Sequence, residues 1–185
     1  MKRGNIEIKA KCPNLIRIQE ILQARSATFM GVDYQIDTYF KTSKGKLKLR
    51  EAILPFEDGL MHYERGDKHG PKFSDITVFQ TPNQDVLKQI LLKSFDVQNI
   101  IQKKRVLFVI DNVRFHLDSV VNLGDFIEIE AQDTDGLLGK NVLRKQCNYY
   151  MTLLKINKND LIAHSYSDLL LNNEKSKHRK NKKNK

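Results

Sequence analysis

The sequence is poor in cysteine and contains no long apolar run. Its only cysteines, Cys12 and Cys147, lie far apart without the spacing of metal ligands, so we expect two reduced thiols in a cytoplasmic protein. No stretch approaches the roughly 18 consecutive apolar residues of a membrane-spanning helix. The basic N-terminal segment MKRGNIEIKAK lacks an apolar core, so we expect no secretory signal. The composition therefore predicts a cytoplasmic protein without a membrane partner.

Positive charge is abundant but unevenly distributed. The 185 residues have a net charge of +10, with 40% hydrophobic and 29% charged residues, which is typical of a soluble globular chain. Residues 174–185 contain seven lysine or arginine residues and one glutamate, whereas residues 1–173 contain 25 basic and 21 acidic ones. We expect one folded domain over 1–173 and a disordered basic tail over 174–185. Such a tail binds polyanions, including nucleic acid, only weakly and in a salt-dependent way.

Hydrophobic periodicity divides the chain into helices and strands. Helical spacing of apolar residues occurs over about 14–25, from about 83, and over about 135–153, with a short turn near 158–164. Period-two alternation predicts strands over residues 5–11, 34–41, 46–50, 60–65, 75–80, 103–110, 113–120 and 126–131. Many short strands favour a sheet that removes its edges by closing. The predicted fold is α+β, a closed eight-stranded antiparallel β-barrel with helices packed on the outside.

The polar faces of these predicted strands are ionic in strand after strand. In one of them, Leu47 and Leu49 alternate with Lys46, Lys48 and Arg50. One interpretation is a solvated outer face whose charges pair weakly across strands. In the other, the helices cover the apolar faces and the charges line the inside of the barrel, where a ligand must neutralise them. The recurrence of the pattern favours the second interpretation.

The types of charge on these faces indicate the ligand. Lysine and arginine suit phosphate oxygens, and arginine offers bidentate hydrogen bonds. The candidate phosphate-binding residues are Lys9, Lys11, Lys48, Arg50, Arg65, Lys103, Arg105 and Arg114. The carboxylates of Glu7, Glu128, Glu130 and Asp118 suit Mg²⁺ or Mn²⁺. Together the two sets predict a metal–polyphosphate complex, since inward carboxylates would repel a phosphodiester backbone. His116 is either a general base or a hydrogen-bonding wall residue.

Five segments carry a resemblance to a known family. They are NIEIK at 5–9, KLKLRE at 46–51, HYERGDKHGPK at 62–72, RFHLDSVVNLGDFIEIE at 114–130 and SYSDLL at 165–170. In this order they resemble the CYTH superfamily, the triphosphate tunnel metalloenzymes that include class IV adenylate cyclases and thiamine triphosphatases. The family's first signature glutamate is replaced here by Asn5, which removes a negative charge from the expected metal site.

The resemblance implies a tunnel that takes a triphosphate and one or two divalent metals. By position, Glu7, Glu128 and Glu130 match metal-binding glutamates. The cations that match phosphate-contacting ones are Lys9, Lys48, Arg50, Arg65, Arg105 and Arg114. Asp118 matches an acidic position near the metal. Either Lys68 or Lys72 matches a loop lysine, and we group Lys72 with Asp118 and His116 as candidate catalytic residues.

Three functions are compatible with these residues. The segments look nearest to the class IV adenylate cyclase branch, which predicts conversion of ATP to cyclic AMP and pyrophosphate. A triphosphatase acting on thiamine triphosphate, a nucleoside triphosphate or tripolyphosphate would use the same walls. A binder of nucleotide or polyphosphate that has lost turnover is the third alternative. The expected partner is in each case a small triphosphate, and a homodimer remains open.

Overall fold

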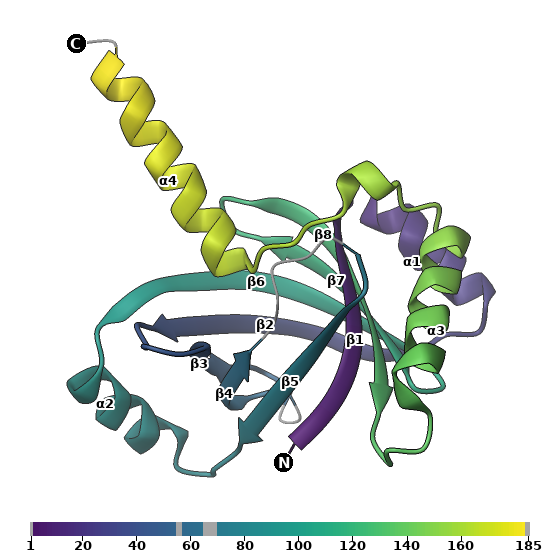
Figure 1. The fold of residues 1–185 in the computed structure, drawn as a ribbon, viewed down its shortest axis with the longest axis horizontal. Coiled ribbons are helices and arrows are strands. Elements are labelled where there is room, and N and C mark those ends of the chain that lie inside the picture. The colour runs from purple at the N-terminus through teal and green to yellow at the C-terminus, as the bar shows by residue number, and fades with distance from the viewer. Residues whose placement is uncertain (1, 55–56, 65–69, 184–185) are drawn as a thin grey trace.

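Eight antiparallel strands and four α-helices account for most of the part of the chain that the computed structural model describes, which is residues 2–54, 57–64 and 70–183 (Figure 1). The strands are β1 (Lys2–Lys11), β2 (Thr28–Phe40), β3 (Lys46–Glu51), β4 (Gly59–Glu64), β5 (Lys72–Phe79), β6 (Val97–Ile110), β7 (Val113–Val120) and β8 (Gly124–Asp133). The helices are α1 (Leu15–Ala24), α2 (Gln84–Ser94), α3 (Gly139–Leu153) and α4 (Tyr166–Lys183), with a 3-10 turn at Lys158–Asp160. All eight predicted strands and the three predicted helices are present, so the predicted α+β class is confirmed.

The sheet is curled into a half-barrel. Its hydrogen-bonded order is β1-β5-β4-β3-β2-β6-β7-β8, and β1 pairs with both β5 and β8. Among the described residues, β5 pairs only with Lys2–Glu7 of β1, whereas β8 pairs with β1 as far as Lys11. The seam is therefore sealed along only part of β1. The prediction of a closed barrel needs this correction, because β5 begins at Lys72, opposite Glu7, so the described pairing of β1 with β5 ends there.

The helices cover the apolar outer faces of the strands. Helices α1 and α3 lie together on one side of the sheet (Figure 1) and pack on the outward side chains of β1, β7 and β8. Leu22 of α1 and Leu143 of α3 are buried in this core with Ile6, Phe115 and Ile129. The side chain of Asn14 caps α1 by accepting a hydrogen bond from the Arg17 amide at 3.0 Å. This packing turns the ionic faces inward, as the second interpretation predicted.

Helix α2 covers another part of the sheet. Its Leu91 packs against Phe40 of β2 and Leu49 of β3. The apolar side chains at the ends of β2 and β3 are thereby buried on the outer face. Lys48 and Arg50 alternate with these residues, so they point into the half-barrel.

An aromatic cluster closes one end of the half-barrel. Tyr39, Tyr63, Phe126 and Tyr166 pack together there with Ile101 and Val120. Tyr166 is the first residue of α4, which then projects away from the sheet (Figure 1). Helix α4 thus begins inside the wall of the half-barrel and ends outside it.

The basic segment after residue 173 is helical as far as Lys183. We predicted a disordered tail because this segment has nothing apolar to bury. The sequence there is rich in lysine, which is a good helix former, and a helix that has already begun at Tyr166 extends at little further cost. Across the described residues, none of the helices has both the length and the apolar character needed to cross a bilayer.

Candidate functional site

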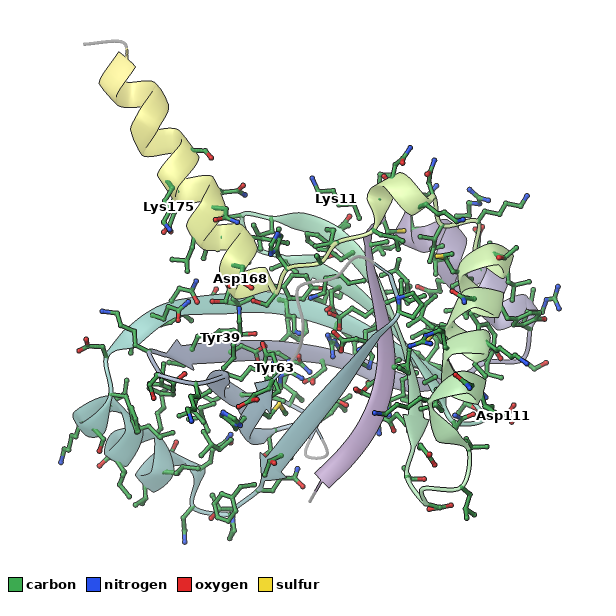
Figure 2. The ribbon with its side chains drawn as sticks, in the orientation of Figure 1. Lys11, Tyr39, Tyr63, Asp111, Asp168 and Lys175 are labelled. Atoms are coloured by element: carbon green, nitrogen blue, oxygen red, sulfur yellow. The ribbon has the colours of Figure 1, made fainter. Side chains whose placement is uncertain are left out.

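The inward faces of the strands surround a cavity of about 1100 Å³, including the space at its open end. Its charged lining residues are Glu7, Lys9, Asp37, Lys48, Arg50, Glu57, Lys103, Arg105, Arg114, Glu128 and Glu130. His116, Asn5 and Gln132 also line it, and Ser165 and Tyr166 contribute from the start of α4. Figure 2 shows Tyr39 and Tyr63 in the hollow of the sheet. The cavity is therefore an ionic site whose walls come from nearly every strand.

One side of the cavity is built around Asp37 of β2. Arg50 donates to this carboxylate through Nε at 2.6 Å and Nη2 at 2.8 Å, and Lys48 Nζ lies 2.8 Å away. Lys103 Nζ approaches the same carboxylate at 3.9 Å. Burial alone would raise the pKa of Asp37, but Arg50, Lys48 and Lys103 hold it well below its usual range. Asp37 fixes three cations from two strands, β3 and β6, in one place.

The adjoining part of the cavity wall is built around Arg105 of β6, which pairs with β2. Its Nε and Nη2 donate to the two Asp118 oxygens at 2.6 Å each, and Nη2 also donates to Glu128 at 2.9 Å. Lys9 Nζ lies 2.9 Å from the other Glu128 oxygen. The Tyr166 hydroxyl donates to Asp118 at 2.9 Å. This network links β1, β6, β7, β8 and the start of α4.

Asp118 does not line the cavity. Its side chain is 0% exposed and lies behind Arg105. Burial would raise its pKa, yet Arg105 and Lys103 hold it far below the usual range. We expected Asp118 near the metal as a catalytic group. The structure instead gives it the position of a residue that orients Arg105.

Hard oxygen donors gather at the Asn5 end of the cavity. Glu7 of β1 pairs in register with Glu130 of β8. The Asn5 amide nitrogen donates to Glu130, whereas the Asn5 Oδ1 atom is buried and has no hydrogen-bond partner. His116 places Nδ1 3.3 Å from Glu128, and its Nε2, also without a hydrogen-bond partner, lies 3.7 Å from Glu130.

This donor set fits a divalent cation in its chemistry. Carboxylate and amide oxygens are preferred by Mg²⁺ and Mn²⁺, and the unpartnered Asn5 Oδ1 is one such oxygen. Within residues 2–54, 57–64 and 70–183, no three carboxylate, histidine or cysteine side chains already form a metal cage. A cation here would thus need further oxygens from the ligand, which is how Mg²⁺ is commonly held on phosphates.

The structure brings most of the predicted site residues together. Those that line the cavity are Glu7, Lys9, Lys48, Arg50, Lys103, Arg105, Arg114, His116, Glu128 and Glu130. Arg65 and Lys68 lie outside the described residues, and the same holds for the side chain of Lys72, whose backbone pairs with Glu7.

Lys11 was predicted among the phosphate-binding cations, and the structure places it outside the cavity. It is the last residue of β1 and is exposed at the rim near α1 (Figure 2). The chain turns away from the half-barrel at Cys12 and Pro13, so the last inward cation of β1 is Lys9.

Three site residues were missed. Asp37 lies on the same face of β2 as Gln35 and Tyr39, opposite the exposed Tyr34 and Ile36, so the period-two pattern could have identified it. Glu57 lies in the connection between β3 and β4, where no periodicity applies. Tyr166 lies at the start of α4, in a segment that the family resemblance covered without marking the tyrosine.

Ligand binding is expected to take up protons above neutral pH. Burial, with Arg50 nearby, lowers the pKa of Lys48 to about 7, and burial beside Arg105 lowers that of Lys103 to about 8. A bound phosphate favours the charged lysine and raises both pKa values. Affinity should therefore be insensitive to these groups below pH 7 and should fall above it, by up to ~10-fold per pH unit for each linked proton.

Isothermal titration with tripolyphosphate between pH 6 and 9, in buffers of different ionisation enthalpy, measures this uptake. Tripolyphosphate also takes up protons in this pH range. Subtracting the proton uptake measured with Lys48→Met removes this contribution of the ligand. Equal proton uptake by the wild type and the variant would contradict the assignment of Lys48.

The curled antiparallel sheet and its ionic interior are typical of proteins that bind ligands inside a β-barrel. Residues 4–166 match the CYTH domain, and the chain belongs to the CYTH domain family. No curated protein matches the sequence.

Solved structures support the same fold. The PH1012 protein of Pyrococcus horikoshii OT3 is 24% identical with a TM-score of 0.73, over 89% of this chain and 98% of that one. A candidate adenylate cyclase of Vibrio parahaemolyticus is 17% identical with a TM-score of 0.72, over 91% and 98%. HpAC1 of Hippeastrum, an adenylyl cyclase candidate with a dominant triphosphatase activity, is 14% identical with a TM-score of 0.61, over 90% and 94%.

Proposed function

We propose that this protein is a metal-dependent enzyme that acts on an organic triphosphate. One observation carries the proposal: buried cations from β1, β3 and β6 and the half-buried Arg114 of β7 share a single cavity with the carboxylates Glu7 and Glu130. The cations suit a phosphate chain, and the carboxylates suit the divalent cation that accompanies it. Family membership and structural neighbours named as cyclase candidates or triphosphatases support the same ligand class.

The walls of the cavity suit an organic triphosphate. Lys9, Lys48, Lys103 and Arg114 bind the phosphate chain, and Asp37 and Asp118 hold the neighbouring arginines in position. The described part of the β4–β5 wall is uncharged, with Met61, Tyr63, Ile76 and Val78 facing the cavity. This wall suits the part of the ligand that carries no phosphate.

The proposed reaction is an adenylate cyclase-like cyclisation of ATP. The 3′-oxygen of the ribose forms a bond to the α-phosphorus, the bond from that phosphorus to the β-bridging oxygen breaks, and pyrophosphate leaves. His116 Nε2 has no hydrogen-bond partner and faces the cavity, so it is the candidate that accepts the hydroxyl proton. Bound Mg²⁺ or Mn²⁺, held by Glu7, Glu130 and Asn5, supplies charge neutralisation at the phosphate oxygens.

A second reaction, hydrolysis of the triphosphate, has an observation in its favour. Asn5 Oδ1 and His116 Nε2 are both buried without hydrogen-bond partners at the same end of the cavity. A water molecule placed between such atoms satisfies both. The same water is a candidate nucleophile, with phosphate as the product.

A product assay distinguishes these functions. The protein is incubated with Mg²⁺ or Mn²⁺ and separately with ATP, thiamine triphosphate and tripolyphosphate. Cyclic AMP with pyrophosphate supports cyclisation, and phosphate release supports hydrolysis. Binding without turnover supports a non-catalytic binder and contradicts the proposed enzyme.

Two adjacent lysines of β6 provide a matched pair of variants. Lys103 is buried in the cavity, whereas Lys104 is exposed on the other face of the same strand. We expect Lys103→Met to weaken triphosphate binding by ~10-fold or more, since it removes a buried charge-assisted contact. Lys104→Met changes the net charge equally and is expected to leave the affinity within about 2-fold. Equal effects of the two variants would place the ligand outside the cavity.

A further inference from the structure

Glu57 puts a carboxylate among the arginines that are expected to bind phosphate. Its Oε1 accepts a hydrogen bond from Arg114 Nη1 at 2.8 Å. Its Oε2 lies 3.4 Å from Arg50 Nη1 and 3.7 Å from Arg105 Nη1. The three arginines belong to β7, β3 and β6, so they converge on this one carboxylate from three strands. Glu57 is 6% exposed and lines the cavity.

The connection between β3 and β4 is built to hold Glu57 in this position. Buried Asp33 accepts hydrogen bonds from the amides of Ile53 at 2.8 Å and Leu54 at 3.1 Å. Gln35 donates to Asp33 at 2.6 Å and approaches Glu57 at 3.5 Å. The position of Glu57 is therefore supported from β2 as well as by the arginines.

Gly59 completes this support. It begins β4 two residues after Glu57 with φ of +129°, and a Cβ atom there would lie 2.7 Å from the Phe79 carbonyl oxygen. Only glycine lets the chain enter β4 so close to β5. The backbone on both sides of Glu57 is thus constrained.

For two of the three arginines, Glu57 is an additional anion rather than the sole partner. Arg50 already has a bidentate carboxylate partner in Asp37, and Arg105 has one in Asp118. Among the described residues, the cavity and its Asp118 support contain six cations and six carboxylates. These are Lys9, Lys48, Arg50, Lys103, Arg105 and Arg114, against Glu7, Asp37, Glu57, Asp118, Glu128 and Glu130. With each of these described residues charged, their charges balance before any ligand enters.

We propose that Glu57 is a specificity-determining residue that occupies the position of a phosphate group and makes the cavity selective for a polyphosphate carrying a divalent cation. The inference rests on the ligand class of the proposed function. It goes beyond that function in assigning the metal requirement of binding to one residue of this chain.

The reason is electrostatic. A free polyphosphate that takes the three guanidinium groups leaves Glu57 as a buried carboxylate without its partners and makes a balanced cavity strongly negative. A polyphosphate that brings a divalent cation supplies both a partner for the carboxylate and compensation for the added charge. Removing the charge of Glu57 removes this penalty for the free polyanion, together with the 2.8 Å ion pair to Arg114.

The test compares tripolyphosphate binding with and without metal. Isothermal titration is carried out in EDTA and in excess Mg²⁺ for the wild type, Glu57→Gln and Glu51→Gln. Glu51 is the matched control, because it pairs with Lys88 at 2.8 Å outside the cavity and carries the same charge. We expect Glu57→Gln to bind metal-free tripolyphosphate ~10-fold or more tightly than the wild type, which corresponds to about 1.4 kcal/mol of binding free energy. The affinity ratio between Mg²⁺ and EDTA should shrink correspondingly, and Glu51→Gln should leave it unchanged.

Two results would overturn the proposal. One is unchanged or weaker metal-free binding by Glu57→Gln. The other is a loss confined to the Mg²⁺ titration, which would make Glu57 a metal ligand. Thermal melting checks that each variant is folded, and Glu57→Ala, which also removes the charge, must change metal-free affinity in the same direction.

The proposed function and this inference fail in different ways. If the wild type turns over no triphosphate but Glu57→Gln gains metal-free affinity, the enzyme proposal fails and the role of Glu57 stands. If turnover occurs and metal-free affinity does not rise in the variant, the role of Glu57 fails. Absence of binding in every variant and both conditions overturns both.

Discussion

Replacing Glu130 with glutamine is expected to abolish the stimulation of triphosphate turnover by divalent metal. Glu130 pairs in register with Glu7 and faces the unpartnered Nε2 of His116, at the end of the cavity where hard oxygen donors gather. The substitution keeps the size of the side chain and one of its two oxygen atoms, but it removes the negative charge that attracts the cation. We expect a loss in kcat of ~100-fold or more, as metal neutralisation of phosphate oxygens contributes several kcal/mol to such reactions.

Steady-state kinetics over a range of Mg²⁺ concentrations, with Mn²⁺ binding measured separately, checks this prediction. Glu51→Gln, outside the cavity, is the control for charge alone. Glu128→Gln offers a second comparison. Because Glu128 forms ion pairs with Lys9 and Arg105, we expect this substitution to lower stability as well as activity. Full metal-dependent activity in the Glu130 variant would remove Glu130 from the metal site.

Asp118→Asn is expected to destabilise the fold by about 3–5 kcal/mol. Asp118 is fully buried and receives two hydrogen bonds from Arg105 and one from Tyr166. Asparagine preserves the shape but leaves a buried guanidinium without its bidentate partner, which is the costly way to break a buried ion pair. Because Tyr166 starts α4, we expect the loss to loosen the attachment of that helix as well.

Urea denaturation at pH 7 measures the free energy of unfolding. The surface variant Asp96→Asn, which breaks an exposed pair with Lys41, should change stability by only about 0–1 kcal/mol. The folded-state pKa of Asp118 is lowered, so its stabilisation is fully present above the unfolded pKa near 4 and is lost as the pH falls. The wild type should therefore lose more stability than Asp118→Asn on acidification, and parallel pH profiles would contradict this role.

Alternation along the strands made most of the site predictable. A residue such as Lys48 must face the interior once Leu47 and Leu49 face outward under a helix. The same reasoning extends to Glu7, Arg114 and Glu128, whose predicted side of the strand is the one observed. Period-two alternation determines on which face of the sheet a side chain lies, but it does not determine whether that side chain reaches the cavity. Asp118 lies on the inward face yet is covered by Arg105, and Lys11 lies beyond the point where β1 leaves the cavity.

The features that the sequence did not predict depend on tertiary contacts between distant segments. Glu57 reaches the arginines because Asp33 and Gln35 hold the preceding connection, and no local pattern encodes that contact. The partial seam between β1 and β5 depends on their register, which alternation alone cannot fix. Helix α4 continues through the basic segment because packing at Tyr166 starts it inside the half-barrel.

The pairing of β1 with β8 also bears on how the protein acquires its site during folding. Glu7 lies on the first strand of the sheet and Glu130 on the last, directly opposite each other. The strands between them can associate with sequence neighbours, such as β3 with β4 and β6 with β7. The β1–β8 contact must instead close a loop of nearly the whole domain, an entropic cost associated with folding times on the order of milliseconds to seconds. A nascent chain therefore lacks the complete proposed metal site until β8 has been synthesised and has paired with β1.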